Sequence, residues 1–426
     1  MSKKILFRSD LPPRLRLAAG MFICPFLFAA KPAVEDDTYA ALKTATGPVI
    51  KIEGNQGYQE FKLMKWEDGT IVDARNARWS TFSWGVKSRH ENPTPNFTTR
   101  NNYPIVLGAD WGGKAWPYRI DLYNFGLCPE PQPNTLHWLG GVIEGTHPLD
   151  TTWNESKAAN GAGITLNALN STIDGVRIHN VHDPIVPLEG NNFTVKNCWI
   201  SWSLDDAIEN DGFAAGVIDD CLFDGFFVFY SGRNTRPDSG RQAEAPGGGK
   251  GSDLRIQNCL IGAGGPYGPG TSREDIARGD PGSLSIGQFW KQSDRDANGI
   301  DRNPAVDLIN NVFYIPRNYI GARASRYDVM PRPAGKMEGN VIIWMGDGDY
   351  PFDYEGKGFT ILKGREGQES WEKAKRDWIA RHPKVPRVKG DPGYDPASHG
   401  TAEPPPGGLA ELAQELIARN PPKSRR

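Results

Sequence analysis

The densest group of ionisable side chains in this 426-residue sequence lies in the segment SLDDAIENDG, residues 203–212. If the segment is one continuous strand, alternation turns Asp205, Glu209 and Asp211 toward the same face. Several carboxylates on one face bind a divalent cation such as Ca²⁺ through their oxygens, or act as an acid/base pair. Because crowded like charges need a compensating cation or substrate, we predict a functional site here with Ca²⁺ as its candidate cofactor.

Candidate proton-transferring groups surround this segment in the repeat described below. Tyr230 and His182 fall on neighbouring repeats, and Lys291 lies in the counterpart strand GQFWKQ. Arg233 and Arg236 belong to the loop that follows Tyr230. A cation beside bound carboxylates suits proton abstraction next to a uronate carboxylate, because it neutralises the enolate-like charge. We therefore predict Lys291, Arg233, Tyr230 and His182 as catalytic candidates and Arg236 as a substrate contact; the competing interpretation is solvated loop arginines.

Two aromatic residues are predicted to face outward, where they would stack on sugar rings: Trp199 and Phe289. The same alignment places Ile185, Ile208 and Phe227 in one inward-facing column. The alternative for the acidic segment is structural, because Asp and Asn side chains often only satisfy turn backbone.

A short internal repeat must position these residues. It reads apolar, any residue, Asn or Asp, Cys or Val, any residue, apolar. The copies lie at 178–181, 195–200, 218–223, 256–261, 308–314 and 337–343, with a glycine variant at 139–143. Each copy reads as two short strands around a bend, and such a unit buries its apolar face only by stacking on other copies. Leucine-rich repeats would need a recurring Leu-x-x-Leu-x-Leu, which is absent.

Asn at the bend tolerates left-handed backbone. We therefore predict an all-β chain, a right-handed parallel β-helix, with Asn180, Asn197, Asp220 and Asn258 one above another. The cysteines at one repeat position should be free thiols facing inward, although a Cys198–Cys221 disulfide is within reach.

The ends of the chain read differently from its middle. Basic residues followed by an apolar run that is too short for a membrane span predict an export signal over residues 1–30. The coil should occupy 34–350, with a short helix near 38–44. Residues 351–426 should form a helical cap and a Pro-rich basic tail, with one helix over 367–382 and a second over 408–420.

Overall charge favours no nucleic-acid partner, because 49 Lys and Arg nearly balance 51 Asp and Glu. Past residue 30 no apolar run is long enough to span a bilayer. We expect a periplasmic or secreted monomer of bacterial origin whose partner is a polysaccharide, most simply an acidic one.

The Asn-Cys and Asn-Val repeats over roughly residues 60–350 resemble the pectin-lyase-like superfamily of right-handed parallel β-helices. More narrowly, Asp205–Asp211, Phe289–Lys291 and Trp344–Pro351 are similar to uncharacterised secreted bacterial β-helix proteins. The superfamily resemblance implies polysaccharide lyases, glycoside hydrolases, uronan epimerases or non-catalytic attachment proteins. Polygalacturonase-type hydrolases carry a His-Gly where this chain has Asp224-Gly225, and their Arg-Ile-Lys is absent.

Three hypotheses therefore remain open. The first is a polysaccharide lyase or related epimerase in which Asp205, Glu209 and Asp211 hold Ca²⁺ or substrate. The second is a glycoside hydrolase that pairs Asp205 with Glu209 or Asp211. The third is a glycan-binding surface protein without catalysis, because one fold hosts many functions.

Overall fold

The computed structural model describes residues 36–57, 67–81, 120–123, 135–145, 162–167, 170–187, 192–210, 214–232, 252–264, 288–292, 305–316 and 335–397. The chain divides into two units, Met1–Asp37 and Thr38–Arg426, and all described helices and strands belong to the second. The predicted export signal and the predicted helix over 408–420 lie outside the described residues.

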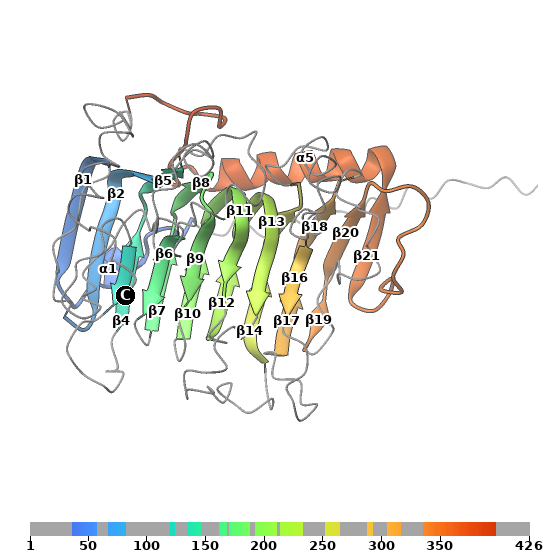
Figure 1. The fold of residues 1–426 in the computed structure, drawn as a ribbon, viewed down its shortest axis with the longest axis horizontal. Coiled ribbons are helices and arrows are strands. Elements are labelled where there is room, and N and C mark those ends of the chain that lie inside the picture. The colour runs from blue at the N-terminus through green and yellow to red at the C-terminus, as the bar shows by residue number, and fades with distance from the viewer. Residues whose placement is uncertain are drawn as a thin grey trace, which may run out of the picture. The chain divides into compact units, whose positions relative to one another are not determined.

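The described strands pair in parallel and fall into three ladders that the chain visits in turn (Figure 1). Ladder 1 comprises β1 (Val49–Gly57), β2 (Thr70–Thr81), β4 (Thr135–Leu139), β7 (Asn170–Asp174), β10 (Asn192–Lys196), β12 (Ala215–Asp219), β14 (Ser252–Gln257), β17 (Ala305–Ile309) and β19 (Met337–Glu338).

Ladder 2 comprises the second parts of β1 and β2, β5 (Val142–Gly145), β8 (Arg177–His179), the first parts of β11 (Trp199–Glu209) and β13 (Leu222–Gly232), β15 (Leu260–Gly262), β18 (Val312–Ile315), β20 (Asn340–Trp344) and β21 (Phe359–Lys363). Ladder 3 comprises β3 (Ile120–Tyr123), β6 (Ala162–Asn167), β9 (Asp183–Pro187), the second parts of β11 and β13, and β16 (Gln288–Gln292). The predicted parallel β-helix is confirmed, and β21 extends it past residue 350.

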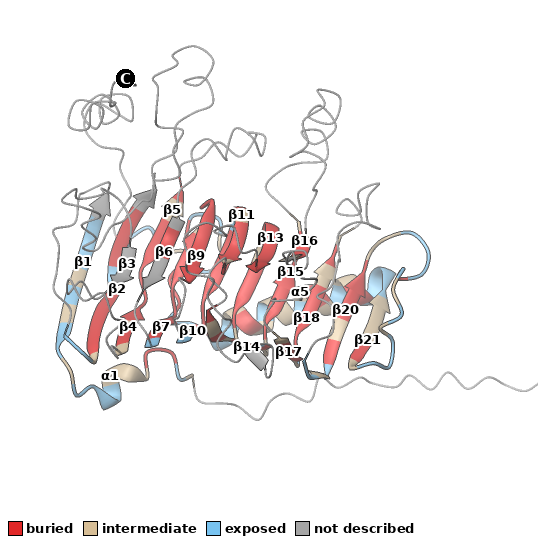
Figure 2. Cartoon of the chain, turned by 60° about the horizontal axis from the view of Figure 1, so that its bottom comes forward, coloured by how far each residue is buried: buried red, intermediate tan, exposed pale blue. Residues whose placement is uncertain are grey.

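The core of the coil consists of apolar rows that run from rung to rung. In ladder 1, Ile173, Val195, Ile218, Ile256 and Leu308 occupy paired positions and are fully buried. Strands of neighbouring rungs lie ~4.8 Å apart, so identical positions make continuous apolar contact. Figure 2 shows this burial along the strands of successive rungs. The repeat therefore sets the fold because each rung buries its apolar side chains only against its neighbours.

The bend between ladders 1 and 2, called here the first bend, is a column of residues with left-handed backbone. Its members are Gly140, Gly175, Asn197, Asp220, Asn258, Asn310 and Gly339. The prediction is confirmed for Asn197, Asp220 and Asn258 and is wrong for Asn180, whose rung supplies Gly175 instead.

Asn180 lies at the second bend, between ladders 2 and 3, where its backbone N–H donates to the Ser201 carbonyl at 3.0 Å. Both bends demand left-handed backbone, so the same apolar-x-Asn signal occurs at each of them. Asn310 carries the positive φ in its rung, at the Asn position of the repeat.

The position after the first bend points into the coil. Cys198, Cys221 and Cys259 occupy it, are fully buried and are free thiols as predicted. Burial raises the pKa of the Cys221 thiol well above its ordinary value. In the next rungs Asn311 and Asn340 take this position, and Asn340 Oδ1 accepts hydrogen bonds from the Asn311 backbone N–H at 3.0 Å and from its Nδ2 at 3.1 Å.

A C-terminal segment, Gly364–Asp391, covers the outer face of ladder 2 and is called here the clasp. It begins with α5 (Gly364–Arg381), close to the predicted 367–382, which lies across the strands in Figure 1. The Trp371 ring stacks on Tyr314 with centroids 5.0 Å apart, and a Cβ at Gly262 would lie 2.4 Å from that indole. The missing side chain at Gly262 therefore lets α5 approach the ladder.

The clasp also contacts residues at the N-terminal end of the coil. Tyr39, just before the short helix α1 (Ala41–Thr44), donates its hydroxyl hydrogen bond to the carbonyls of Gly175 and Lys384. At the opposite end Tyr350, Phe352 and Tyr354 pack around Phe359 and close the core, as a solenoid end requires. Within the described part of the chain, no helix combines the length and apolarity needed to cross a bilayer.

Candidate functional site

Ladder 3 carries the acidic segment that the sequence singles out. Ile185 of β9 pairs with Ile208 of β11, which pairs with Tyr230 of β13, which pairs with Trp290 of β16. Glu209 then pairs with Ser231, and Ser231 pairs with Lys291. The β-helix therefore places the acids of β9 and β11 and the lysine of β16 on neighbouring strands of ladder 3.

A β-bulge in β11 sets the orientation of the acids. Ser203 pairs with Phe226 and Asp206 with Val228, so β11 has one residue more than β13 over this stretch. The extra residue breaks the alternation that a continuous strand would impose. Consecutive acids of β11 consequently reach different partners: Asp205 lies beside His182, whereas Asp206 binds Lys291.

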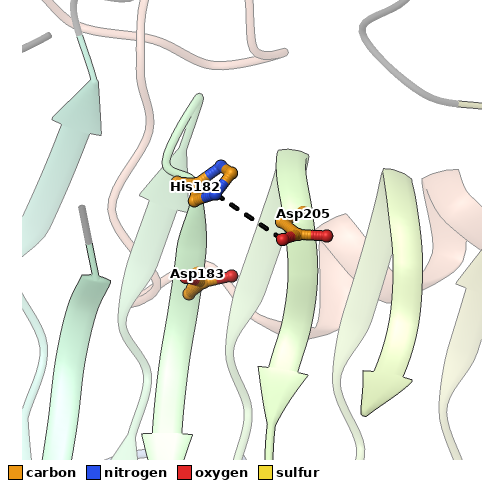
Figure 3. Close-up of side chains that lie close together, drawn as sticks. All are labelled: His182, Asp183 and Asp205. Carbon is orange, nitrogen blue, oxygen red and sulfur yellow. Dashed lines mark ion pairs between the residues drawn. The ribbon is translucent and has the colours of Figure 1, made fainter. Parts of the chain in front are cut away.

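His182, Asp183 and Asp205 converge at this point, as Figure 3 shows. One ligand atom from each residue lies within 4.8 Å of the others. His182 Nε2 is 3.6 Å from Asp205 Oδ2, and the Asp206 backbone N–H donates to Asp183 Oδ1 at 3.2 Å. His182 and Asp183 are buried, whereas the Asp205 side chain retains 14% exposure. Asp205 is thus the most accessible member of the cluster.

A buried ion pair flanks the cluster. Lys291 Nζ lies 2.7 Å from Asp206 Oδ2, and the Asp206 side chain is 1% exposed against 25% for that of Lys291. An ion pair of this kind favours the charged ammonium, so Lys291 suits charge neutralisation better than proton abstraction. Among the predicted catalytic candidates, Lys291 therefore suits an electrostatic role.

The electrostatic consequence of this crowding falls on Asp183. Burial raises the pKa of Asp183 well above its usual value, and the charges of Glu209, Asp205 and Asp206 raise it further. Like charges thus lie around Asp183, and Lys291 supplies an ammonium nearby. Crowding of like charges favours a bound cation or a protonated carboxyl.

The donor atoms fit a divalent cation, but not the all-oxygen set predicted for Ca²⁺. Ca²⁺ takes six to eight oxygens, whereas the cluster offers an imidazole nitrogen with two carboxylates. A donor set that combines imidazole with carboxylates also suits transition-metal ions. The charges of Asp205 and Glu209 both raise the pKa of Asp183. Asp211 lies outside the described residues, so the predicted cation site of Asp205, Glu209 and Asp211 stays a prediction.

Two of the predicted site residues, Tyr230 and Phe289, are buried in the core and do not face the wall. Tyr230 is fully buried, accepts a hydrogen bond from Asn210 Nδ2 at 2.7 Å and stacks on Trp290. Tyr230 occupies the inward position that the alignment assigned to Phe227. The β-bulge in β11 and the length of the second bend shift the register between β11 and β13. Phe289 is also fully buried in the core. The predicted catalytic role of Tyr230 and the predicted stacking role of Phe289 are therefore wrong.

Trp199 does face outward, but the clasp covers it. Its ring lies 4.4 Å from the guanidinium carbon of Arg177 and 5.3 Å from that of Arg387, and Trp378 packs against its edge. It is 4% exposed, so the prediction that it binds sugar is wrong. The sequence showed the outward position, but it could not show that a distant helix occupies it.

Arg233 and Arg236 lie outside the described residues, so their predicted roles stay predictions. The sequence analysis singled out neither Asp183 nor Asp206. The signal was present: each lies two residues before an inward isoleucine, Ile185 or Ile208, which the alignment had placed in one column.

Comparison with protein-family models found no match. Searches of curated proteins and of solved structures found none either.

Proposed function

We propose that this chain is a carbohydrate-active, pectin-lyase-like β-helix that cleaves an acidic polysaccharide by β-elimination, or epimerises it, at the wall of ladder 3. The observation that carries the proposal is the convergence of His182, Asp183 and Asp205, where burial and neighbouring carboxylates raise the pKa of Asp183. His182, Asp183 and Asp205 could hold a divalent cation, which would supply positive charge to neutralise the carboxylate of a uronate. We further propose that the protein works as an exported monomer.

The roles follow from accessibility. Asp205, with His182 and Asp183 behind it, would hold the cation, and Glu209 adds negative charge at its edge. In β-elimination a base removes the proton next to the uronate carboxylate, a carbon–carbon double bond forms and the glycosidic C–O bond breaks. Lys291 would stabilise the charge that develops on the carboxylate. Arg233 is the remaining candidate base.

The test is incubation of the native chain with pectate, alginate and glucuronan, with Ca²⁺, with Mn²⁺ and with EDTA. We expect one uronan to yield unsaturated product, seen as ultraviolet absorbance, in a reaction that EDTA abolishes. Absence of unsaturated product from all three polymers with either cation would overturn β-elimination. A lack of effect of EDTA on a productive reaction would overturn the cation.

Glycoside hydrolysis is the second candidate, and the raised pKa of Asp183 beside Asp205 favours it. Paired carboxyls with separated pKa values supply a general acid and its partner. One oxygen of each lies within 4.8 Å of the other, which places the two carboxyls close together, as retaining enzymes require. Reducing ends without unsaturated product would select this reaction.

The non-catalytic alternative makes a different prediction. A glycan binder would show no turnover, and its binding would survive the double change Lys291→Ala and Asp205→Ala.

A further inference from the structure

Trp202, at the second bend, is an exposed aromatic residue on a backbone that disfavours it. The large hydrophobic residues exposed in the described part of the chain are Val49 and Trp202, the latter 36% accessible. Trp202 has φ +56°, in the left-handed region where a bulky side chain is a genuine outlier. An isolated exposed apolar residue needs no explanation, but one held in strained backbone does.

The other left-handed positions show how the chain normally meets this demand. Apart from Trp202 and Tyr39, the described non-glycine residues with positive φ are all Asn or Asp. Tyr39 is 7% exposed and is held by hydrogen bonds to Asp174, Gly175 and Lys384. Packing and bonding thus offset the strain at Tyr39. The exposed indole of Trp202 gains no comparable burial, so folding alone does not account for tryptophan here.

The neighbouring rungs leave the indole accessible. Asn180 occupies the equivalent position in the preceding rung, and Gly225 occupies it in the following rung. A Cβ at Gly225 would lie 2.6 Å from the Gly264 carbonyl oxygen, so no side chain fits there. The His179 ring meets Trp202 edge-on at 6.2 Å, and burial lowers the pKa of His179 to about 3. A neutral imidazole therefore supports the indole from one side.

Trp202 also lies close to the acidic cluster along the same strand. Only Ser203 and Leu204 separate it from Asp205, so the two Cα atoms lie at most about 11 Å apart along the chain. The bulge that orients Asp205 follows directly. The second bend and the cluster are consequently neighbouring parts of β11.

We propose that Trp202 is the stacking platform for a pyranose ring next to the one that the acidic cluster engages. Aromatic faces bury the apolar C–H face of a sugar while its hydroxyl groups stay in water. The ligand is a uronate oligosaccharide of at least two residues, and the inference rests on the proposed action on acidic glycans. Trp202 then determines affinity and register of the glycan chain, while the cluster performs the chemistry.

The experiment compares the native full-length chain with Trp202→Asn and Trp202→Phe. Asn is the residue of the preceding rung and accepts left-handed backbone, so Trp202→Asn should raise the melting temperature. On the uronan that the native chain cleaves, it should lower kcat/KM by about tenfold, mainly through KM, an effect equal to 1.4 kcal/mol. Trp202→Phe should retain most of kcat/KM. Val49→Ala, the exposed control, should change neither property.

Unchanged KM in Trp202→Asn, on a substrate that the native chain turns over, would overturn the platform and leave the proposed function standing. If the native chain binds uronate oligosaccharides without turnover, and Trp202→Asn weakens that binding about tenfold, the platform stands and the lyase fails. If the native chain neither binds nor cleaves any of the three uronans, both are overturned.

Discussion

The outer face of ladder 2 and the wall of ladder 3 use charged residues in opposite ways. Under the clasp, Arg177 is 1% exposed and binds both carboxylate oxygens of Asp391, at 2.8 and 3.0 Å. On ladder 3, three carboxylates raise the pKa of Asp183, although Lys291 binds one of them. The covered face pairs its buried guanidinium with one carboxylate, whereas the wall crowds several carboxylates around a buried one. Under the proposed function, this difference separates a stabilising surface from a ligand-binding one.

The two bends also differ, because the first is regular and the second is not. The first bend is a regular column of Asn, Asp and Gly with left-handed backbone, and its neighbours repeat in register. The second bend carries Trp202 and leads into the bulge of β11. The rung that bears the acidic cluster thus combines a β-bulge with an unusual bend residue, as is common near functional sites.

The largest expected effect is on the covered face. Asp391→Ala removes the partner of a buried guanidinium and should lower the free energy of unfolding by about 3–5 kcal/mol. Asp377→Ala breaks an exposed ion pair of α5 with Lys373 and should cost less than about 1 kcal/mol. Urea unfolding measures both. Equal losses in the two variants would show that the clasp does not depend on this buried pair.

A smaller effect is expected at the first bend. Asn258 has φ +56° and donates from Nδ2 to Asp219 Oδ1 at 2.7 Å. Asn258→Ala loses both the tolerance of left-handed backbone and this hydrogen bond, and should cost about 2 kcal/mol. Asn258→Gly keeps the backbone freedom, so it should cost about half as much. Urea unfolding measures both losses. If Asn258→Gly lowers the free energy of unfolding more than Asn258→Ala does, the first bend is not a regular column of left-handed residues.

The smallest expected effect depends on pH and concerns ladder 3. Asp183 has a folded-state pKa above its unfolded value, so the native state binds its proton more tightly. Stability contributed by this proton is present below the unfolded pKa and is lost as pH rises toward the folded pKa. Asp183→Asn cannot ionise, so in EDTA it should raise the melting temperature at pH 8 and change it little at pH 3.5.

Thermal unfolding at the two pH values measures this difference. A variant that is destabilised more at pH 8 than at pH 3.5 would show that Asp183 is ionised and locally compensated in the native protein. The matched control is Asp224→Asn, whose carboxylate binds Lys375 under the clasp. It should lose stability at pH 8 because it breaks that ion pair.

The fold could be predicted from the sequence because most copies of the repeat occupy the same structural position, the first bend. Asn197, Asp220 and Asn258 share the first bend, and Cys198, Cys221 and Cys259 follow them into the core. The sequence was not sufficient to distinguish the two bends, since Asn180 satisfies the same backbone demand at the second one. One misplaced copy did not change the fold class, because the remaining copies fixed the stacking.

The site was predictable only in outline. Asp205, Glu209, His182 and Lys291 were placed on one wall, and the structure has them at neighbouring strands of ladder 3. The bulge was not foreseeable, because a bulge depends on the pairing with β13 and not on the local pattern of β11. For the same reason Tyr230 was placed on the wall instead of in the core.

The most direct test compares one carboxylate from each face: Asp205→Asn on ladder 3 and Asp224→Asn under the clasp, each assayed for turnover of the uronan that the native chain cleaves. Both changes remove one negative charge and keep the side-chain shape. We expect Asp205→Asn to lower kcat/KM by about a hundredfold or more, as loss of about 2.7 kcal/mol would do, while Asp224→Asn turns over like the native chain. Equal turnover by Asp205→Asn and the native chain would contradict the assignment of the ladder 3 cluster as the functional site.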